Sequence, residues 1–273
     1  MPGVRKSDEA RYLKALKRLF QSFFDALKKD PDAKVEDLLK EHTFELYQQA
    51  ERVAKGMVTA QEQYSAKGWK DAAYKSTRGR AIYQQLKKDM KGPVGDRVRE
   101  LIEENAQLIV TLSERWAKYA AEYSFRQAVM GKRPEQIEAE MRKRIPQHMQ
   151  KNLKCIARTE TSKAQAAITQ ARAENLGISA YIWHACGDER ARFSHQSMDG
   201  ILVFYNDPPS PERLFPQAGH PAYGQYHAGC TFNCRCHQEP VVEWEYLPDI
   251  IRVYSHGEIR AMTRTAIIHD FGR

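Results

Sequence analysis

Thiol and imidazole side chains concentrate in the second half of this 273-residue sequence. The five cysteines all lie there, at Cys155, Cys186, Cys230, Cys234 and Cys236. Thiolates and imidazoles are the ligands that zinc prefers in proteins. Cys234 and Cys236 are two residues apart, so on a strand both side chains point to one face. With His195 and either Cys230 or His227 they are candidates for a tetrahedral zinc site, and the predicted set is His195, Cys230, Cys234 and Cys236.

The same segment is compatible with other chemistry. A Cys–His nucleophile would place Cys234 or Cys236 beside His195, oriented by Asp188 or Asp199. A magnesium-dependent nuclease would use His195 with the same two aspartates. The sequence contains no nucleophile elbow, no Gly-x-Gly-x-x-Gly motif and no phosphate-binding loop to anchor such reactions. The simplest alternative is that reduced, buried cysteines and hydrogen-bonded histidines stabilise a small sheet, because an odd number of cysteines argues against a disulfide scaffold.

A second polar cluster, Arg158-Thr159-Glu160-Thr161-Ser162, falls in the middle of a predicted helix. Threonine and serine are unfavourable in a helix interior, so a tertiary reason for them is expected. Arg158 and Glu160 are two residues apart and cannot face each other on a helix. Their expected partners are Asp188, Arg190 and Arg192. We therefore predict structural ion pairing for this cluster.

The first 176 residues have the apolar spacing of amphipathic helices, with stripes of residues three and four apart. Asp30-Pro31 interrupts this pattern, because the residue before a proline resists the helical region. Gly177 suits the C-terminal cap of the last helix. The predicted helices cover residues 12–27, 35–64, 69–90, 98–131 and 146–175, with Pro134 in the first turn of a further helix.

The apolar period changes to two after residue 177. Alternating β-forming residues predict strands over 178–186 and 201–205, with a hairpin-type turn at Asp199-Gly200. Residues 234–242 are a third predicted strand, 250–254 a candidate fourth, and 258–268 a candidate short helix.

The predicted fold class is α+β, with a long α-helical N-terminal half followed by a small β-containing module. The predicted division is a basic α-helical domain over 1–150, a module of one helix and a small antiparallel sheet over 151–242, and a C-terminal tail over 243–273.

Charge is distributed as unevenly as cysteine. The net charge is +8, and residues 1–150 hold 30 Lys and Arg against 22 Asp and Glu, whereas residues 151–273 hold 13 of each. A basic half implies an acidic partner, either nucleic acid or an acidic protein surface. The alternative is an ordinary Lys-rich helical surface, because acidic residues are interleaved with the basic ones.

No stretch of about 18 consecutive apolar residues occurs, so we expect no membrane-spanning helix and no membrane partner. The N-terminus lacks the apolar segment of a secretory signal, and synthesis in a cytoplasm is expected.

Several short motifs follow one another between about residues 150 and 242. They are Ala157-Arg158-Thr159-Glu160-Thr161, Trp183, Asp188-Glu189-Arg190, His195, Asp199-Gly200, Asn233-Cys234-Arg235-Cys236 and Pro240-Val241. In this order they resemble the phage Mu F-like minor head protein family, whose members act in head morphogenesis of tailed double-stranded DNA phages. The resemblance covers roughly a third of the chain.

The resemblance implies a structural motif and no catalytic residue, so we do not expect an enzyme. The motif residues are Arg158, Thr159, Glu160, Thr161, Trp183, Asp188, Arg190, His195, Gly200, Cys234, Arg235 and Cys236. The resemblance also implies a low-copy component of the virion interior near the portal, made in the host bacterial cytoplasm. Its implied partners are the portal, scaffold and major capsid proteins. Packaged DNA, contacted without sequence specificity, is a candidate partner of the basic half.

The sequence departs from the pattern of family members that look zinc-binding. Those members carry a pair of cysteines after Asp-x-Arg and a His-Pro before Asn-Cys-Arg-Cys, where this chain has Arg192, His195, Thr231 and Phe232. The family pattern therefore implies no cofactor here, and zinc remains an alternative. Two rival functions also stay open. One is a metal-dependent nuclease or hydrolase centred on His195 and Cys234 or Cys236, and the other is a basic DNA-binding protein with a zinc-like module.

Overall fold

The computed structural model describes residues 3–30, 33–188, 191–219 and 221–272, with the side chains at 43–45, 47 and 48 excepted. The chain forms two compact units. We call them the helical unit, made of residues 6–58 and 100–157, and the sheet unit, made of residues 1–5, 59–99 and 158–273. This arrangement confirms the predicted α+β fold class, although the predicted boundary at residue 150 falls inside one long helix.

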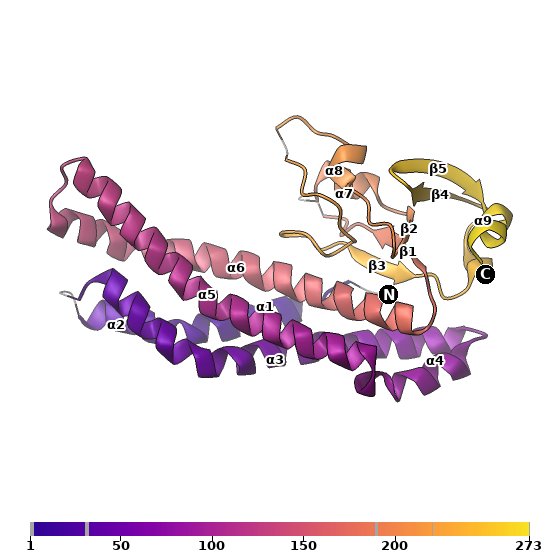
Figure 1. Cartoon of the computed structure of the whole chain (residues 1–273), viewed down its shortest axis with the longest axis horizontal. Coiled ribbons are helices and arrows are strands. Elements are labelled where there is room, and N and C mark those ends of the chain that lie inside the picture. The colour runs from indigo at the N-terminus through magenta and orange to yellow at the C-terminus, as the bar shows by residue number, and fades with distance from the viewer. Residues whose placement is uncertain (1–2, 31–32, 189–190, 220, 273) are drawn as a thin grey trace. The chain divides into compact units, whose positions relative to one another are not determined.

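The helical unit contains two short helices and parts of three long ones (Figure 1). These are α1 (Lys6–Leu19), α2 (Gln21–Lys29), α3 (Val35–Lys75), α5 (Pro93–Val129) and α6 (Pro134–Asn175). Their apolar stripes form its core, in which the rings of Phe20 and Trp116 meet edge to face with centroids 4.8 Å apart. Burial of these stripes, rather than helix propensity, supplies most of the stability of such helices.

Several helix boundaries differ from the prediction. The helix predicted over 69–90 is divided among the end of α3, α4 (Gly79–Leu86) and η1 (Asp89–Lys91), and α5 begins at Pro93 rather than at residue 98. The helix predicted over 12–27 is divided at Phe20, whose backbone leaves helical geometry (φ −92°, ψ 5°). The break predicted after residue 64 is wrong, because α3 continues to Lys75 with Trp69 fully buried on it. The new helix predicted at Pro146 is part of α6, which begins at Pro134. A proline removes only one helical hydrogen bond, and the neighbouring Ile145 and Met149 are buried.

His42 lies in the core of the helical unit and carries a pH dependence. Its side chain is buried, its Nδ1 lies 3.0 Å from Ser22 Oγ, and its ring packs against Phe20 and Phe23. Burial lowers the pKa of His42 to about 4. The unfolded chain therefore binds a proton between about pH 6.5 and pH 4 that the folded chain does not bind.

We expect acid to destabilise the protein through this residue. As the pH falls from 7 to 4.5, His42 should remove about 2–3 kcal/mol of the free energy of unfolding. Urea unfolding at both pH values would show a smaller loss in His42→Leu than in the natural protein. The matched control is His269→Gln, at an exposed histidine, which should leave the pH dependence unchanged. An equal acid loss in His42→Leu would contradict this assignment.

The sheet unit is organised around five strands in the spatial order β3-β1-β2-β4-β5. The strands are β1 (Ala180–His184), β2 (Leu202–Phe204), β3 (His237–Pro240), β4 (Ile250–Ser255) and β5 (Glu258–Thr263). The remaining short elements are α4 (Gly79–Leu86), η1 (Asp89–Lys91), α7 (Phe193–Ser197), α8 (Pro211–Leu214), η2 (Trp244–Tyr246) and α9 (Arg264–Phe271).

The sheet extends one prediction and corrects another. Within 151–242, β1 pairs antiparallel with β2 and with β3, whereas β4, which lies outside this range, runs parallel to β2 with Leu202 opposite Val253. The short helix predicted over 258–268 is mostly β5, which forms a hairpin with β4. His256 and Gly257 have positive φ angles of 50° and 89°. Two central residues of this kind make the turn that suits a two-residue hairpin.

The predicted tail at 243–273 supplies part of the core that covers one face of the sheet. Leu247, Ile251, Val253 and Ile267 pack there with residues of β1 and β2. The other face is covered by residues of α3, α4, α6 and the loops, including Trp69, Ile82 and Ala173. Apolar groups on both faces explain why β1 and β2 are almost completely buried.

A buried ion network ties α6 to two other segments of the sheet unit. Arg172 is 2% exposed. Its guanidinium donates to Asp89 Oδ2 at 2.8 Å, to the Glu62 carbonyl oxygen at 3.0 Å and to Glu62 Oε1 at 2.5 Å. Arg172 therefore supplies a counter-charge to the more deeply buried carboxylate, Asp89, and also donates hydrogen bonds to the partly exposed Glu62.

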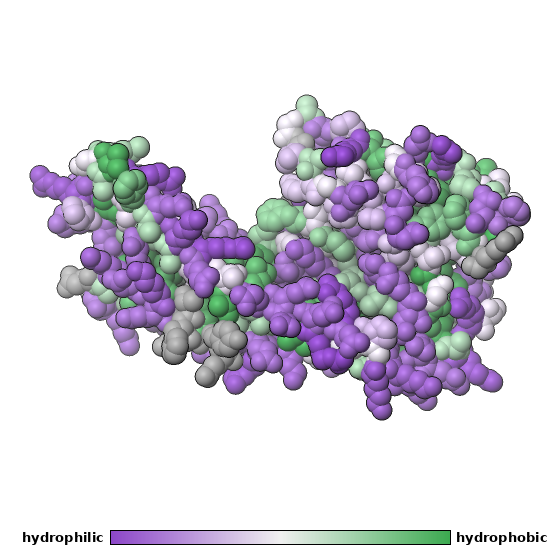
Figure 2. Space-filling view, in the orientation of Figure 1, coloured by the Kyte–Doolittle hydropathy of each residue, from purple (hydrophilic) through white to green (hydrophobic). Residues whose placement is uncertain are grey.

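The described helices include none with the length and apolar character of a membrane span. In Figure 2, hydrophilic residues dominate the visible surface of the helical segments.

Candidate metal centre

Three of the four predicted zinc ligands meet in the sheet unit. His195, Cys234 and Cys236 are buried, and their ligand atoms all lie within 4.8 Å of one another. The Nδ1 atom of His195 is 3.4 Å from Cys234 Sγ and 3.3 Å from Cys236 Sγ. His195 comes from α7, whereas the two cysteines lie just before β3.

These separations fit a tetrahedral zinc site. Bonds of about 2.3 Å to sulfur and 2.0–2.1 Å to nitrogen, at tetrahedral angles, place ligand sulfur and nitrogen atoms about 3.6 Å apart. Small shifts of the side chains would therefore accommodate the ion. Two thiolates would neutralise its charge, and the third bond would come from a neutral imidazole.

Tyr226 and Glu212 fix the orientation of the His195 ring. The Tyr226 hydroxyl donates to Glu212 Oε1 at 2.6 Å, so its oxygen is left to accept from His195 Nε2 at 2.9 Å. Nδ1 then carries the lone pair and faces the thiols. A second-sphere carboxylate that sets the tautomer of a histidine ligand is a regular feature of metal sites.

In the absence of a metal, a hydrogen bond between the thiols of Cys234 and Cys236 shifts their pKa values in opposite directions. The hydrogen bond from Cys236 holds the pKa of the Cys234 thiol well below its ordinary value. The same bond, with burial, raises the pKa of Cys236. A lowered pKa favours the thiolate form of Cys234, which is the form of cysteine that binds a metal.

The motif on α6 positions the two cysteines through Asn233. Asn233 has a left-handed backbone (φ 56°), which few residues other than glycine adopt. Thr159 Oγ1 accepts from the Asn233 amide at 2.9 Å, and Arg158 Nη1 donates to Asn233 Oδ1 at 2.9 Å. These two bonds hold the turn that directs Cys234 and Cys236 toward His195.

Three other residues of the predicted motif, Asp188, Trp183 and Gly200, contact neighbouring protein groups. Asp188 forms an ion pair with Arg235, between the two cysteines. Trp183 is fully buried on β1, and its ring lies edge to face with His195, with centroids 5.8 Å apart. Gly200 takes a positive φ of 74° and donates its amide to the Trp183 carbonyl at 2.9 Å, so it closes the turn before β2.

Several details differ from the prediction. Cys230 is not in the group of donor atoms that meet, and burial raises the pKa of its thiol to about 12. Cys234 and Cys236 precede β3, so strand alternation does not bring them together. Glu160 forms an ion pair with Lys163 on its own helix at 3.2 Å. Thr161 is buried on the same helix, and Arg190 lies outside the described residues.

Sequence reasoning missed Tyr226 and Glu212. Both lie in the long segment rich in proline and glycine between β2 and β3, where no periodic pattern marks a buried residue. The available signal was chemical, since a metal-binding histidine usually needs an acceptor for its second nitrogen.

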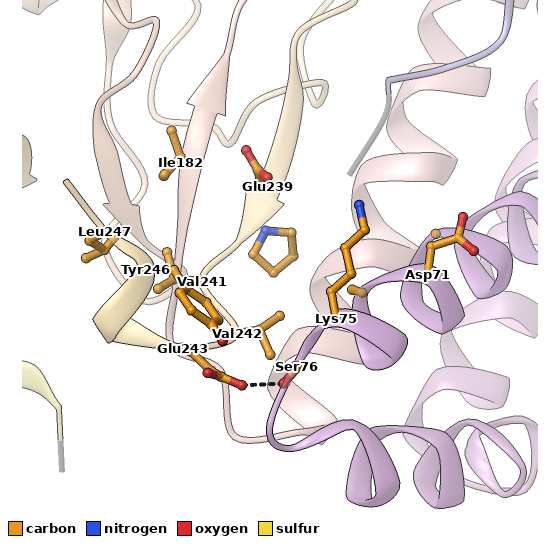
Figure 3. Close-up of a pocket in the computed structure, with 13 residues that line it drawn as sticks. Asp71, Lys75, Ser76, Ile182, Glu239, Val241, Val242, Glu243, Tyr246 and Leu247 are labelled. Carbon is orange, nitrogen blue, oxygen red and sulfur yellow. Dashed lines mark hydrogen bonds between the residues drawn. The ribbon is translucent and has the colours of Figure 1, made fainter.

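Two of the cavities in the described part of the sheet unit bear on this site. One, of about 90 Å³, is lined by the metal-donor side chains together with Arg158, Cys186, Asp188, Ala191, Arg192, Asn233 and Arg235. Of the other described lining residues, Cys186 carries a thiol and Asp188 a carboxylate, and Asp188 forms the ion pair with Arg235. The other, of about 590 Å³, appears in Figure 3 and contains none of the predicted site residues. Its Glu243 is already bound by Ser76 Oγ at 2.5 Å, the contact dashed in Figure 3.

The residues of this site lie within a segment that matches a known protein family. Residues 121–239 match the family model described as phage Mu protein F like protein, a segment that runs from α5 into β3. An uncharacterized protein of Haemophilus influenzae is 33% identical over 150 residues, which are 55% of this chain and 30% of that protein. The chain thus matches less than a third of the length of this relative. No solved structure matches the chain significantly.

Proposed function

Because residues 121–239 belong to the phage Mu protein F-like family, we propose that the protein is a minor head protein of a tailed double-stranded DNA phage. In this proposal it acts in head morphogenesis inside the virion, near the portal, after synthesis in the host cytoplasm. Its partners are the portal, scaffold and major capsid proteins. The observation that carries the proposal is the family match, which includes every element that supplies the metal donors.

The site supports an architectural role rather than catalysis. Both ring nitrogens of His195 are engaged, one toward the thiols and the other toward Tyr226. Asp188, the carboxylate in the adjoining cavity, forms an ion pair with Arg235. A nuclease or hydrolase needs a group in position to activate water, and these partners occupy the two described candidates. We therefore propose that a zinc ion held by His195, Cys234 and Cys236 would fasten α7 to the segment before β3.

Particle analysis tests the proposed function. Quantitative mass spectrometry of purified proheads and mature heads should detect the protein at low copy number relative to the major capsid protein. Tails purified from the same lysate are the control and should lack it. Absence of the protein from both head fractions would overturn the proposal.

The basic half leads to a separate prediction about packaged DNA. Phosphate contacts by Lys and Arg are independent of sequence and release counterions. Binding to unrelated duplexes should therefore be equally strong, and it should weaken by about 10³-fold or more between 50 mM and 200 mM salt if six or more phosphates are contacted. Gel-shift titrations with two unrelated duplexes would check both statements. Absence of binding at low salt would remove duplex DNA as a partner of residues 1–150.

A further inference from the structure

We infer that the small cavity beside the metal donors binds one phosphate group of a nucleic-acid strand whose bases are unpaired. This inference goes beyond the proposed contact of the basic half with duplex DNA, because it uses other residues and another form of nucleic acid. It rests on the charge of the cavity, its size and the aromatic side chains at its edge.

Three arginines face one small space. Arg158, Arg192 and Arg235 line the cavity of about 90 Å³, and Asp188 is the carboxylate among the described lining residues. Guanidinium groups bind phosphate oxygens through paired N–H donors in a planar fork. Two thiolates and a zinc ion would add no net charge, so the described lining keeps an excess of two positive charges. An anion is the ligand that such a lining attracts.

The size of the cavity selects the phosphate group rather than a whole nucleotide. Its volume of about 90 Å³ is several times what one water molecule requires. Pockets that enclose drug-sized ligands are about 300–1,000 Å³. A phosphate group therefore fits inside, whereas the attached sugar and base must lie outside the cavity.

Two exposed aromatic residues contact Arg192, one of the side chains that line the cavity. Tyr223 is 44% exposed and Phe232 is 56% exposed. The Arg192 guanidinium stacks over the Tyr223 ring at 4.6 Å and donates to the Phe232 carbonyl oxygen at 2.7 Å. Arg192 thus contacts the ring of Tyr223 and the backbone of Phe232. Unpaired bases stack on exposed aromatic side chains, whereas bases in a duplex are already stacked on one another.

Variants at this edge can be tested by fluorescence anisotropy on the full chain, with its zinc content measured. The probes are a labelled oligothymidylate, a duplex of mixed sequence and inorganic phosphate as a competitor. We expect Arg192→Ala, Tyr223→Ala and Phe232→Ala each to weaken single-strand binding by about tenfold. The same variants should leave duplex affinity unchanged, and inorganic phosphate should compete with the single strand.

The matched control is Arg213→Gln, an exposed arginine of α8 outside the cavity lining, which should bind the single strand normally. Arg192→Ala removes contacts to Tyr223, Phe232 and His195, so its thermal unfolding and zinc content are compared with those of the natural protein. The two exposed aromatic variants keep the test decisive if Arg192→Ala unfolds. Unchanged single-strand affinity in both aromatic variants overturns the inference. An equal loss of duplex affinity overturns the requirement for unpaired bases. Cleavage of the oligonucleotide would instead favour the hydrolase alternative. None of these outcomes depends on whether the protein is found in heads, so failure here and failure of the proposed function are distinguishable.

Discussion

Replacing Arg172 with methionine should lower the free energy of unfolding by about 3–5 kcal/mol, because Asp89 is left buried without a counter-charge. Asp89 is 3% exposed and accepts from Arg172 Nε at 2.8 Å. Methionine keeps much of the volume of the arginine stem, so the loss of charge rather than a cavity dominates the effect. Urea unfolding followed by circular dichroism would measure the change.

Two further variants identify the cause. Arg172→Met combined with Asp89→Leu should recover much of the lost stability, because an apolar pair can replace a buried ion pair at little cost. Arg260→Ala removes an exposed ion pair with Glu258. The side chain of Arg260 is 76% exposed and that of Glu258 is 63% exposed. It should change stability by less than about 1 kcal/mol. A similar loss in both single-arginine variants would contradict the assigned role of burial.

Zinc should copurify with the protein at about one ion per chain, held by His195, Cys234 and Cys236. Cys236→Ser and His195→Ala should each abolish the bound metal. A ligand present at about 100–1,000 times its Kd stabilises a folded protein by about 3–4 kcal/mol. Removing zinc should therefore lower the Tm by roughly 6–16 °C in a chain of this size. Elemental mass spectrometry and thermal unfolding with and without chelator are the measurements.

Cys230→Ser is the informative control for the zinc prediction. The sequence places Cys230 in the ligand set, but the structure leaves it outside the group of donor atoms that meet. We therefore expect Cys230→Ser to retain its zinc. Metal content near zero in the natural protein, with unfolding unaltered by chelator, would rule out the site. Loss of zinc in Cys230→Ser would restore the ligand set predicted from the sequence.

Apolar periodicity predicts the α+β class and the change from helices to strands near residue 177. These features are local, because a stripe of residues three and four apart or an alternation of two specifies which face of an element must be buried. The same is true of Gly200, whose left-handed turn follows from its own lack of a side chain. Helix boundaries were less predictable. A helix was predicted to begin at Pro146, but this proline lies inside α6, where buried neighbours such as Ile145 and Met149 hold the helix together.

The ligand set and the sheet order were decided by the tertiary structure. His195 meets Cys234 and Cys236 because α7 and the segment before β3 converge, and no spacing in the chain encodes that approach. Tyr226, which orients His195, comes from a segment without periodicity. The parallel pairing of β2 with β4 likewise depends on contacts between residues about 50 positions apart, and chain-distant contacts of this kind leave no periodic trace in either strand.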